Sequence, residues 1–259
     1  MFKDKRNNRE WLMGESRLNT IVAFFIIVII WHVLSMFINQ PILPRPMSVL
    51  EIFISSFPTD LGRHFFASFK RVVISIVLAV IVSAPLGILI GQLKFLNRIF
   101  SPFIYLLYPV PKVVFVPVII LLFGIGDGAK VLMIFIILFF QILVLSRDAA
   151  THLRPELILS VKSLGAKKRM MFLYVFLPAT LPAIFTGVRQ SIGTAIAVLY
   201  VAELFATKYG LGYYIYLTGS TLFDYPAMYA GIFAMGILGF GLYFLTDYLE
   251  KKVCKWRFV

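Results

Sequence analysis

Three ionisable residues, Lys112, Arg189 and Glu203, interrupt long apolar stretches of the sequence. If those stretches cross a membrane, each charge costs at least about 2.5 to 3.5 kcal/mol at the bilayer centre, so such side chains face protein or water. Close to four helical turns, or about 21 Å, separate Arg189 from Glu203, so the two cannot pair directly. Glu203 and its neighbour Tyr200 therefore have two interpretations. They border a polar path or a subunit seam, or the carboxylate is capped by nearby hydroxyls and fixes helix packing.

A second group of polar residues, Tyr105, Tyr108 and Lys112, surrounds the sequence Pro109-Val-Pro111. Irregular backbone at membrane depth is tolerated only where it lines protein or a cavity. The pattern predicts that these residues border a pathway across the membrane. A simple proline kink is the alternative interpretation.

Motifs for catalysis or cofactor binding are missing from the sequence. The run from Gly124 to Lys130 is superficially similar to a phosphate-binding loop, but it lacks the Gly-Lys-Ser/Thr ending, and a tight hairpin explains it better. Serines in the apolar stretches have no neighbouring base, and the three histidines are isolated from one another. Cys254 is the only cysteine, which excludes an internal disulfide and a cysteine-based zinc site. We therefore expect no enzymatic activity, no bound metal and no cofactor on this chain.

The composition is that of a membrane protein. Hydrophobic residues make up 60% of the 259 residues and charged residues 14%, whereas a soluble domain carries about 25% charged residues. The net charge of +13 could indicate nucleic-acid binding. The basic residues are scattered between apolar stretches and form no aromatic-interleaved patch, so we expect no nucleic-acid partner.

Six apolar stretches are long enough to span a bilayer as helices, and they predict an all-α, polytopic fold. The first is longer than the apolar region of a signal peptide, so it counts as a helix. An even number of spans places both termini on one side. With a cytoplasmic N-terminus, that side carries 17 lysines and arginines against 6 on the other, as the positive-inside rule requires. The predicted spans are residues 20–38, 68–92, 99–123, 129–146, 183–206 and 227–248.

The longest predicted cytoplasmic loop, residues 147–182, contains its own helix signals. Pro155 suits the first position of a helix, apolar residues follow at helical spacing, and Gly165 supplies a C-terminal stop. The pattern predicts a short amphipathic helix. It could lie on lipid headgroups, with the basic residues that follow Gly165 reaching phosphates, or it could dock on a partner.

Several motifs, in order along the chain, resemble the permeases of ABC importers, and within them the nitrate, sulfonate and taurine group. The loop carries Ser163-Leu-Gly-Ala166, then Leu177-Pro178, Pro182 and Thr186-Gly-Val-Arg189. The similarity covers about residues 43–248. The other matching motifs are Ser68-Phe-Lys-Arg71, Ala84-Pro-Leu-Gly87, Tyr108-Pro-Val-Pro-Lys112 with Pro117, Phe123-Gly-Ile-Gly126 and Val201-Ala-Glu203.

This resemblance implies a coupling helix that sits in a groove of an ATPase subunit. The chain departs from the family pattern at Leu159-Ser-Val161, where Glu-Ala-Ala is usual. The expected translocation-pathway residues are Tyr105, Tyr108, Lys112, Tyr200 and Glu203. The expected ATPase-coupling residues are Glu156, Leu157, Leu159, Ser160, Val161, Lys162, Ser163, Leu164, Gly165 and Ala166.

The resemblance also implies partners, a location and a division of the chain. ATP and Mg²⁺ are expected on two separate ATPase subunits, a second permease copy is expected to complete the pathway, and an external binding protein is expected to deliver the solute. The expected location is a bacterial-type inner (plasma) membrane. Residues 1–64 are expected to form a tail, the first span and an external loop, and residues 65–259 the permease core with helices two to six.

The implied cargo is a small solute such as a sulfonate, taurine, nitrate or a vitamin precursor. Two other classes of protein remain as alternatives. An intramembrane enzyme would need a nucleophile with a base, or a metal cluster, at membrane depth. An autonomous secondary carrier would be supported by inverted repeats, and none is visible in the sequence.

Overall fold

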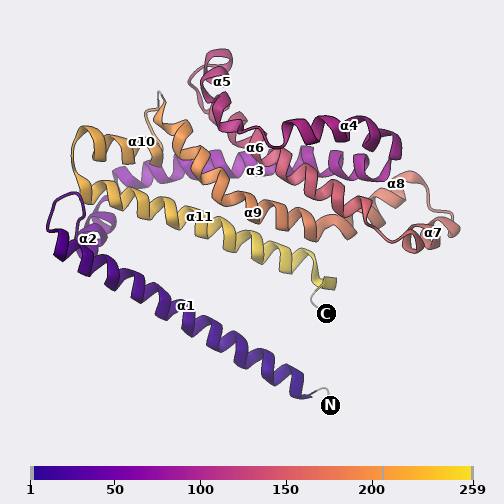
Figure 1. Cartoon of the computed structure of the whole chain (residues 1–259), viewed down its shortest axis with the longest axis horizontal. Helices are drawn as coiled ribbons and strands as arrows, with labels where there is room; N and C mark the ends of the chain where they lie inside the picture. Colours follow the sequence, from indigo (N-terminus) through magenta and orange to yellow (C-terminus); the bar gives the residue numbers. More distant parts are fainter. Residues whose placement is uncertain (1–2, 206, 258–259) are drawn as a thin grey trace.

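The computed structural model describes residues 3–205 and 207–257, and every regular element in them is helical. Figure 1 shows an elongated bundle in which α3, α6, α9 and α11 run side by side. Shorter helices cover its two ends, with α2 and α10 at one end and α7 and α8 at the other (Figure 1). The α-helices are α1 (Lys3–Ile38), α2 (Pro46–Ser56), α3 (Asp60–Gln92), α4 (Lys94–Leu107), α5 (Val116–Phe123), α6 (Asp127–Thr151), α7 (Pro155–Ser163), α8 (Lys168–Met171), α9 (Leu177–Leu204), α10 (Leu211–Tyr216) and α11 (Tyr225–Val253).

In the part of the chain that the structure describes, five helical segments are long and apolar enough to cross a membrane, and a bent pair can supply a sixth span. This agrees with the predicted number of spans. The helices extend beyond the apolar stretches that predicted them: α3 begins at Asp60 and α6 at Asp127. An acidic residue in the first turn interacts favourably with the positive end of the helix dipole, a signal that hydropathy does not read.

The span predicted over residues 99–123 is broken at the prolines where irregular backbone was expected. The chain forms α4, a break, a 3-10 turn (η1, Lys112–Phe115) and α5, and the two halves are bent by 80°. Pro109 and Pro111 lack the backbone N–H that a continuous helix needs, which explains the position of the break. Figure 1 shows α4 lying along the bundle and α5 turned away from it.

The cytoplasmic loop predicted over residues 147–182 is shorter than expected, so its predicted bounds are wrong. Residues 147–151 belong to α6, and Lys168–Leu204 form a continuous helical segment of 37 residues. This segment contains α8, a π-helical turn (η2, Phe172–Phe176) and α9. The connection is therefore confined to residues 152–167 and holds α7. The predicted short helix is confirmed, since α7 begins at Pro155 and Gly165 has a φ of +82°.

The tightest helix contact joins α3 to α6. A Cβ atom added at Gly87 would lie 2.6 Å from the carbonyl oxygen of Leu143 and 2.8 Å from Cβ of Ser146. One added at Gly91 would lie 2.9 Å from Cβ of Ala150. The Gly-x-x-x-Gly spacing in α3 thus serves packing inside the chain, as small residues do at close helix crossings.

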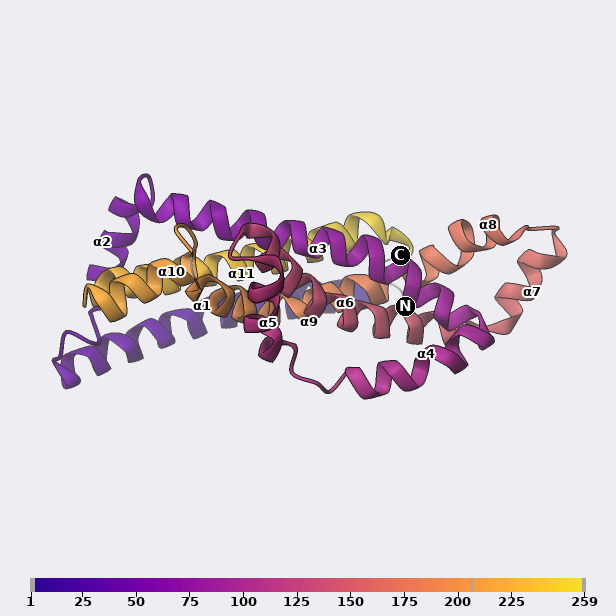
Figure 2. The ribbon, with the colours of Figure 1, turned by 90° about the horizontal axis from the view of Figure 1, so that it is seen from above.

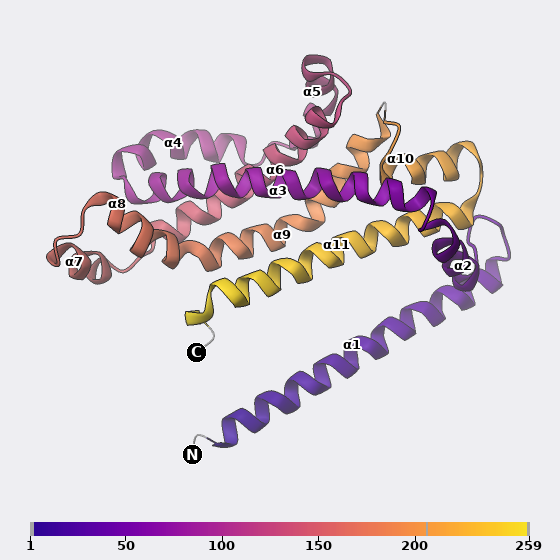
Figure 3. The same cartoon turned by 180° about the vertical axis from the view of Figure 1, so that it is seen from behind.

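The first helix lies apart from the bundle (Figures 1 and 3). Only 6% of its apolar window is buried, and its clearest side-chain contact is the stacking of Trp31 on Tyr229 of α11, with ring centroids 5.7 Å apart. The rest of its apolar surface is available to lipid or to other proteins. The short helices α2 and α10 were not predicted, because each is too short to give a span-length hydropathy signal.

Candidate functional site

Glu203 lies at the centre of a buried polar cluster near the α10 end of the bundle. Its side chain is fully buried, and each of its carboxylate oxygens accepts hydrogen bonds. Arg71 Nη1 donates to Oε1 over 2.6 Å, the backbone N–H of Gly212 donates to Oε2 over 2.9 Å, and the Ser68 hydroxyl lies within 2.9 Å of both oxygens. A buried carboxylate is stable only with such partners.

Arg71 joins three helices and a loop through this cluster. Besides Glu203 on α9, its guanidinium donates to the Asp127 carboxylate at the start of α6, over 2.6 and 2.9 Å, and to the carbonyl oxygen of Tyr209, over 2.8 Å. Asp127 has 62% of its side chain exposed, whereas Arg71 has 6%. The arginine therefore holds the ends of α3, α6 and α9 in one arrangement.

The start of α10 and the residue before it require glycine, because the backbone there packs directly on Glu203 and Tyr200. A Cβ atom at Gly210 would lie 2.6 Å from either carboxylate oxygen, and one at Gly212 would lie 2.6 Å from the carbonyl oxygen of Tyr200. The imidazole of His64 closes the other side, with Nδ1 3.0 Å from the backbone nitrogen of Gly210. The cluster thus fixes the loop between α9 and α10 as well as the helices.

The five predicted pathway residues lie in four different places. Glu203 is in the buried cluster. Tyr105 is largely exposed on α4 and lies against Arg147, whose guanidinium carbon is 5.5 Å from the ring centroid. Tyr108 and Lys112 line one cavity, and Tyr200 lines another on the opposite face of α9.

The cavity at the break between α4 and α5 has a volume of about 430 Å³ and is bounded by α6 and α9. Its walls are mostly apolar, and Lys112 is its charged residue. The ammonium group of Lys112 donates to the carbonyl oxygen of Tyr108 and lies 4.9 Å from the ring centroid of Phe140. A cavity therefore lies at the predicted break, and the side chain of Lys112 gives it one positive charge.

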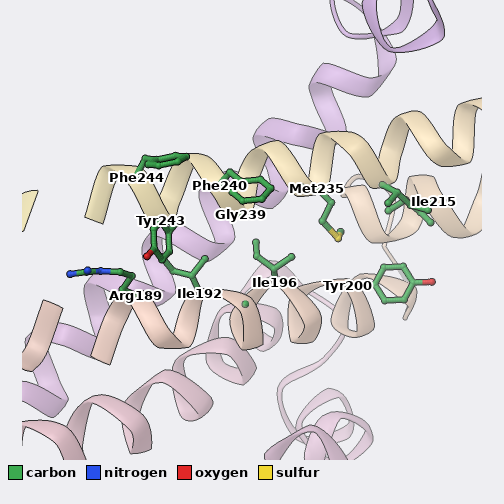
Figure 4. Close-up of a pocket in the computed structure, with 13 residues that line it drawn as sticks. Arg189, Ile192, Ile196, Tyr200, Ile215, Met235, Gly239, Phe240, Tyr243 and Phe244 are labelled. Carbon is green, nitrogen blue, oxygen red and sulfur yellow. The ribbon is translucent and has the colours of Figure 1, made fainter. Parts of the chain in front are cut away.

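A larger cavity of about 630 Å³ lies between α9 and α11. Figure 4 shows Arg189 near one end, Tyr200 near the other, and apolar side chains such as Ile196 and Met235 between them. Arg189 forms ion pairs with Glu250 and, over 3.5 Å, with Asp247, both on α11. Its charge is thus balanced by protein carboxylates, and Arg189 pairs with residues other than Glu203, consistent with their predicted separation.

The predicted coupling residues are brought together on α7 and in the turn that follows it. None of the residues of α7 is buried, and Leu157, Leu159 and Leu164 expose large apolar surfaces. Hydroxyl groups of Ser160 and Ser163 bond to carbonyl oxygens of the same helix. The helix projects from the end of the bundle (Figure 2), where a partner could reach it.

Residues 83–255 match the family of binding-protein-dependent transport system inner membrane components. The chain belongs to this family. The permease family predicted from the loop and proline motifs is therefore confirmed, and with it a multi-pass location in the inner membrane. The matched segment contains the break, both cavities, α7 and Glu203.

Four relatives extend the similarity over most of the permease. A putative ABC transporter permease of Methanocaldococcus jannaschii is 34% identical over 237 residues, covering 89% of this chain and 88% of the relative. The taurine transport system permease of Escherichia coli K12 is 29% identical, covering 99% and 98%. Relatives named as permeases for aliphatic sulfonates in Bacillus subtilis and for nitrate in Synechocystis are 28% and 26% identical, over 98% and 96% of this chain.

A solved structure supports the fold of the permease. A chain of the MetNI methionine ABC transporter in an inward-facing conformation superposes with a TM-score of 0.65 and 18% identity. The superposed region covers 74% of the permease and 95% of the MetNI chain. The permease therefore shares the fold of this ABC transporter chain.

Sequence reasoning missed most of the partners of Glu203. The predicted topology places Arg71 among the six basic residues on the external side, and the predicted span 68–92 begins at Ser68. The spacing held a signal: His64, Ser68 and Arg71 recur every three or four residues, which places them on one face of a helix that starts before the apolar stretch. The identity of their partner, 132 residues further along the chain in the case of Arg71, could come only from the fold.

Proposed function

We propose that this permease forms the solute pathway of an ATP-driven importer and that α7 couples it to cytoplasmic ATPase subunits. The observation that carries the proposal is the position of α7, which projects from the bundle with no buried residue (Figure 2). A short helix with exposed apolar side chains is suited to a groove on a partner, as in helix-in-groove recognition. The sequence Leu159-Ser-Val161 keeps that surface small and apolar without the usual glutamate.

A continuous helical segment that follows α7 supports the coupling role. The chain turns at Gly165 and enters the continuous segment Lys168–Leu204, which is about 55 Å long at 1.5 Å per residue. Its far end carries Glu203, hydrogen-bonded to Arg71 of α3. Movement of α7 by an ATPase would therefore be transmitted along one helix to the opposite end of the bundle.

The proposed assembly has a division of labour. Two ATPase subunits bind ATP and Mg²⁺, two copies of the permease enclose the pathway, and an external binding protein supplies the solute. The names of the relatives favour a small anion or a related solute, such as a sulfonate, taurine, nitrate or a vitamin precursor. In this arrangement the permease has no catalytic residue.

Replacement of Gly165 tests the coupling role. Gly165 has a φ of +82°, a conformation that costs an ordinary residue about 1 to 2 kcal/mol, so Gly165→Val should misplace α7. We expect weaker co-purification with the ATPase and slower ATP-driven uptake in proteoliposomes. Gly126→Ala is the matched control, because a Cβ atom there meets nothing within 4 Å. Normal complex formation and uptake by Gly165→Val would refute the proposed role of α7.

A further inference from the structure

The cavity at the break between α4 and α5 holds a positive charge that no carboxylate balances. Among the described residues, no carboxylate oxygen lies within 4.0 Å of the Lys112 ammonium group, which bonds only to the carbonyl oxygen of Tyr108. Arg189, in the cavity between α9 and α11, is instead paired with Asp247 and Glu250. An intramembrane cation without a counter-ion is costly, and an anion bound beside it would offset part of that cost.

Aromatic rings keep the Lys112 ammonium group in the cavity. It lies 4.9 Å from the ring centroid of Phe140 on α6 and 5.4 Å from that of Tyr108. These distances are within the range of cation–π attraction. The break fixes the base of the side chain, since Pro111 precedes it and η1 begins at Lys112. The charge is thus positioned before any ligand arrives.

Two neutral polar residues on other helices line the same cavity. They are Gln141 of α6 and Thr194 of α9. The buried side-chain oxygen of Gln141 has no hydrogen-bond partner among the described residues. A rotated amide would present its two N–H donors instead, and the Thr194 hydroxyl can also donate. Donors from three chain segments therefore surround the space.

The remaining walls suit a short carbon chain. Val113, Ile137 and Val198 are among the apolar residues that complete the lining. The volume of about 430 Å³ is in the range of small-molecule sites, which combine apolar walls with a few fixed polar groups. A fully hydrated inorganic ion would gain little from these walls, whereas a small organic anion would contact both kinds of surface.

We propose that this cavity is a membrane-embedded site for a small organic anion, whose charged group contacts Lys112 and whose apolar part contacts the valine and isoleucine side chains. This proposal rests on the proposed function, because the site would lie on the solute pathway. Small organic anions are then the substrate class of the permease. Gln141 and Thr194 orient the anion by hydrogen bonds. The cavity selects against cations because Lys112 is fixed in it.

Protection of Lys112 from chemical modification tests the site directly. The permease with its ATPase, in lipid nanodiscs, is treated with an amine-methylating reagent, and modification of Lys112 is followed by mass spectrometry. Ethanesulfonate at millimolar concentration should slow the reaction, whereas ethanol and tetramethylammonium should not. Lys70, which is exposed on α3, provides the internal reference. This measurement requires no transport, so it separates failure of the site from failure of the proposed function.

Equal protection by the three probes, or none by ethanesulfonate, would overturn the proposal. The proposal would also be overturned if Lys112 did not react with the reagent in the assembled complex without solute. A second permease copy or lipid would then fill the cavity. Protection by ethanesulfonate alone supports the site even if uptake cannot be reconstituted.

Transport by charge variants gives a second test in the reconstituted importer. Loss of one charge-assisted contact should lower uptake of an organic anion about tenfold or more in Lys112→Gln. Lys112→Arg keeps the charge and should restore most of the uptake, and Lys70→Gln should behave as the wild type. Wild-type anion uptake by Lys112→Gln would contradict the proposal. If Lys112→Gln fails to assemble, Lys112→Arg still decides, because it should transport organic anions.

Discussion

Arg71 and Glu203 show how one buried ion pair can organise this permease. The arginine has three oxygen partners on three different segments, and Glu203 is fully buried among donors from α3 and from the first turn of α10. Glu203 was predicted to line a pathway or a seam, with helix packing as the alternative. Its partners and complete burial favour the packing interpretation for the conformation described, and its role during transport stays a prediction.

Removal of Arg71 should destabilise the permease far more than removal of Asp127. Arg71→Met leaves the Glu203 carboxylate buried without its cationic partner, which costs about 3 to 5 kcal/mol. Asp127→Asn breaks only the exposed side of the cluster and should cost about 1 kcal/mol or less. Thermal unfolding of the purified permease in detergent measures both. The double variant Arg71→Met/Glu203→Met should lose less stability than the sum of its single variants; additive losses would show that the two side chains do not interact.

At the scale of elements, small residues and prolines decide how the helices meet. Gly87 and Gly91 let α6 approach α3, while Pro109 and Pro111 interrupt the third span and leave a hollow beside α6 and α9. The first effect could be predicted from Gly-x-x-x-Gly spacing. The 80° angle between the halves of the broken span could not, because prolines permit a bend without specifying its size.

Replacement of Gly87 by alanine and replacement of Gly241 by alanine should have opposite effects on the stability of the permease. Gly87→Ala places a methyl group 2.6 Å from the carbonyl oxygen of Leu143, and overpacking of this kind costs about 1 to 3 kcal/mol. Gly241→Ala on α11 meets nothing within 4 Å, and its higher helix propensity should stabilise by up to about 1 kcal/mol. Thermal unfolding of the two variants distinguishes the signs. A Gly87→Ala variant as stable as Gly241→Ala would contradict the close approach of α3 and α6.

For the whole molecule, the distribution of basic residues predicts which end of the bundle faces the cytoplasm. The proposal that α7 meets an ATPase requires the same orientation, with α7 inside and the loop before α10 outside. Native Cys254 interferes little with a labelling test of this orientation. It is fully buried, and burial raises the pKa of its thiol, so little reactive thiolate is present at neutral pH.

Cysteines introduced at Lys162 and Lys208 should react from opposite sides of the membrane. Both lysines are exposed, the first on α7 and the second in the loop between α9 and α10. A membrane-impermeant maleimide should label Lys208→Cys in intact cells and Lys162→Cys only after permeabilisation. The parent chain with Cys254 alone should remain almost unlabelled in both conditions. Labelling of both cysteines from the same side would refute the predicted topology.

The sequence by itself determined that the chain is a helical membrane protein, where its apolar stretches lie, that a short helix begins at Pro155, and which permease family it belongs to. These conclusions depend on local composition and on motifs, and each is encoded within a few neighbouring residues. Only the tertiary structure decided which distant residues meet. It paired Arg71 with Glu203 and placed Tyr200 and Lys112 in two cavities on opposite faces of α9. It also left Lys112 in a cavity whose described lining residues include no carboxylate. Such contacts depend on how helices rotate and cross, and the packing of the whole bundle sets both.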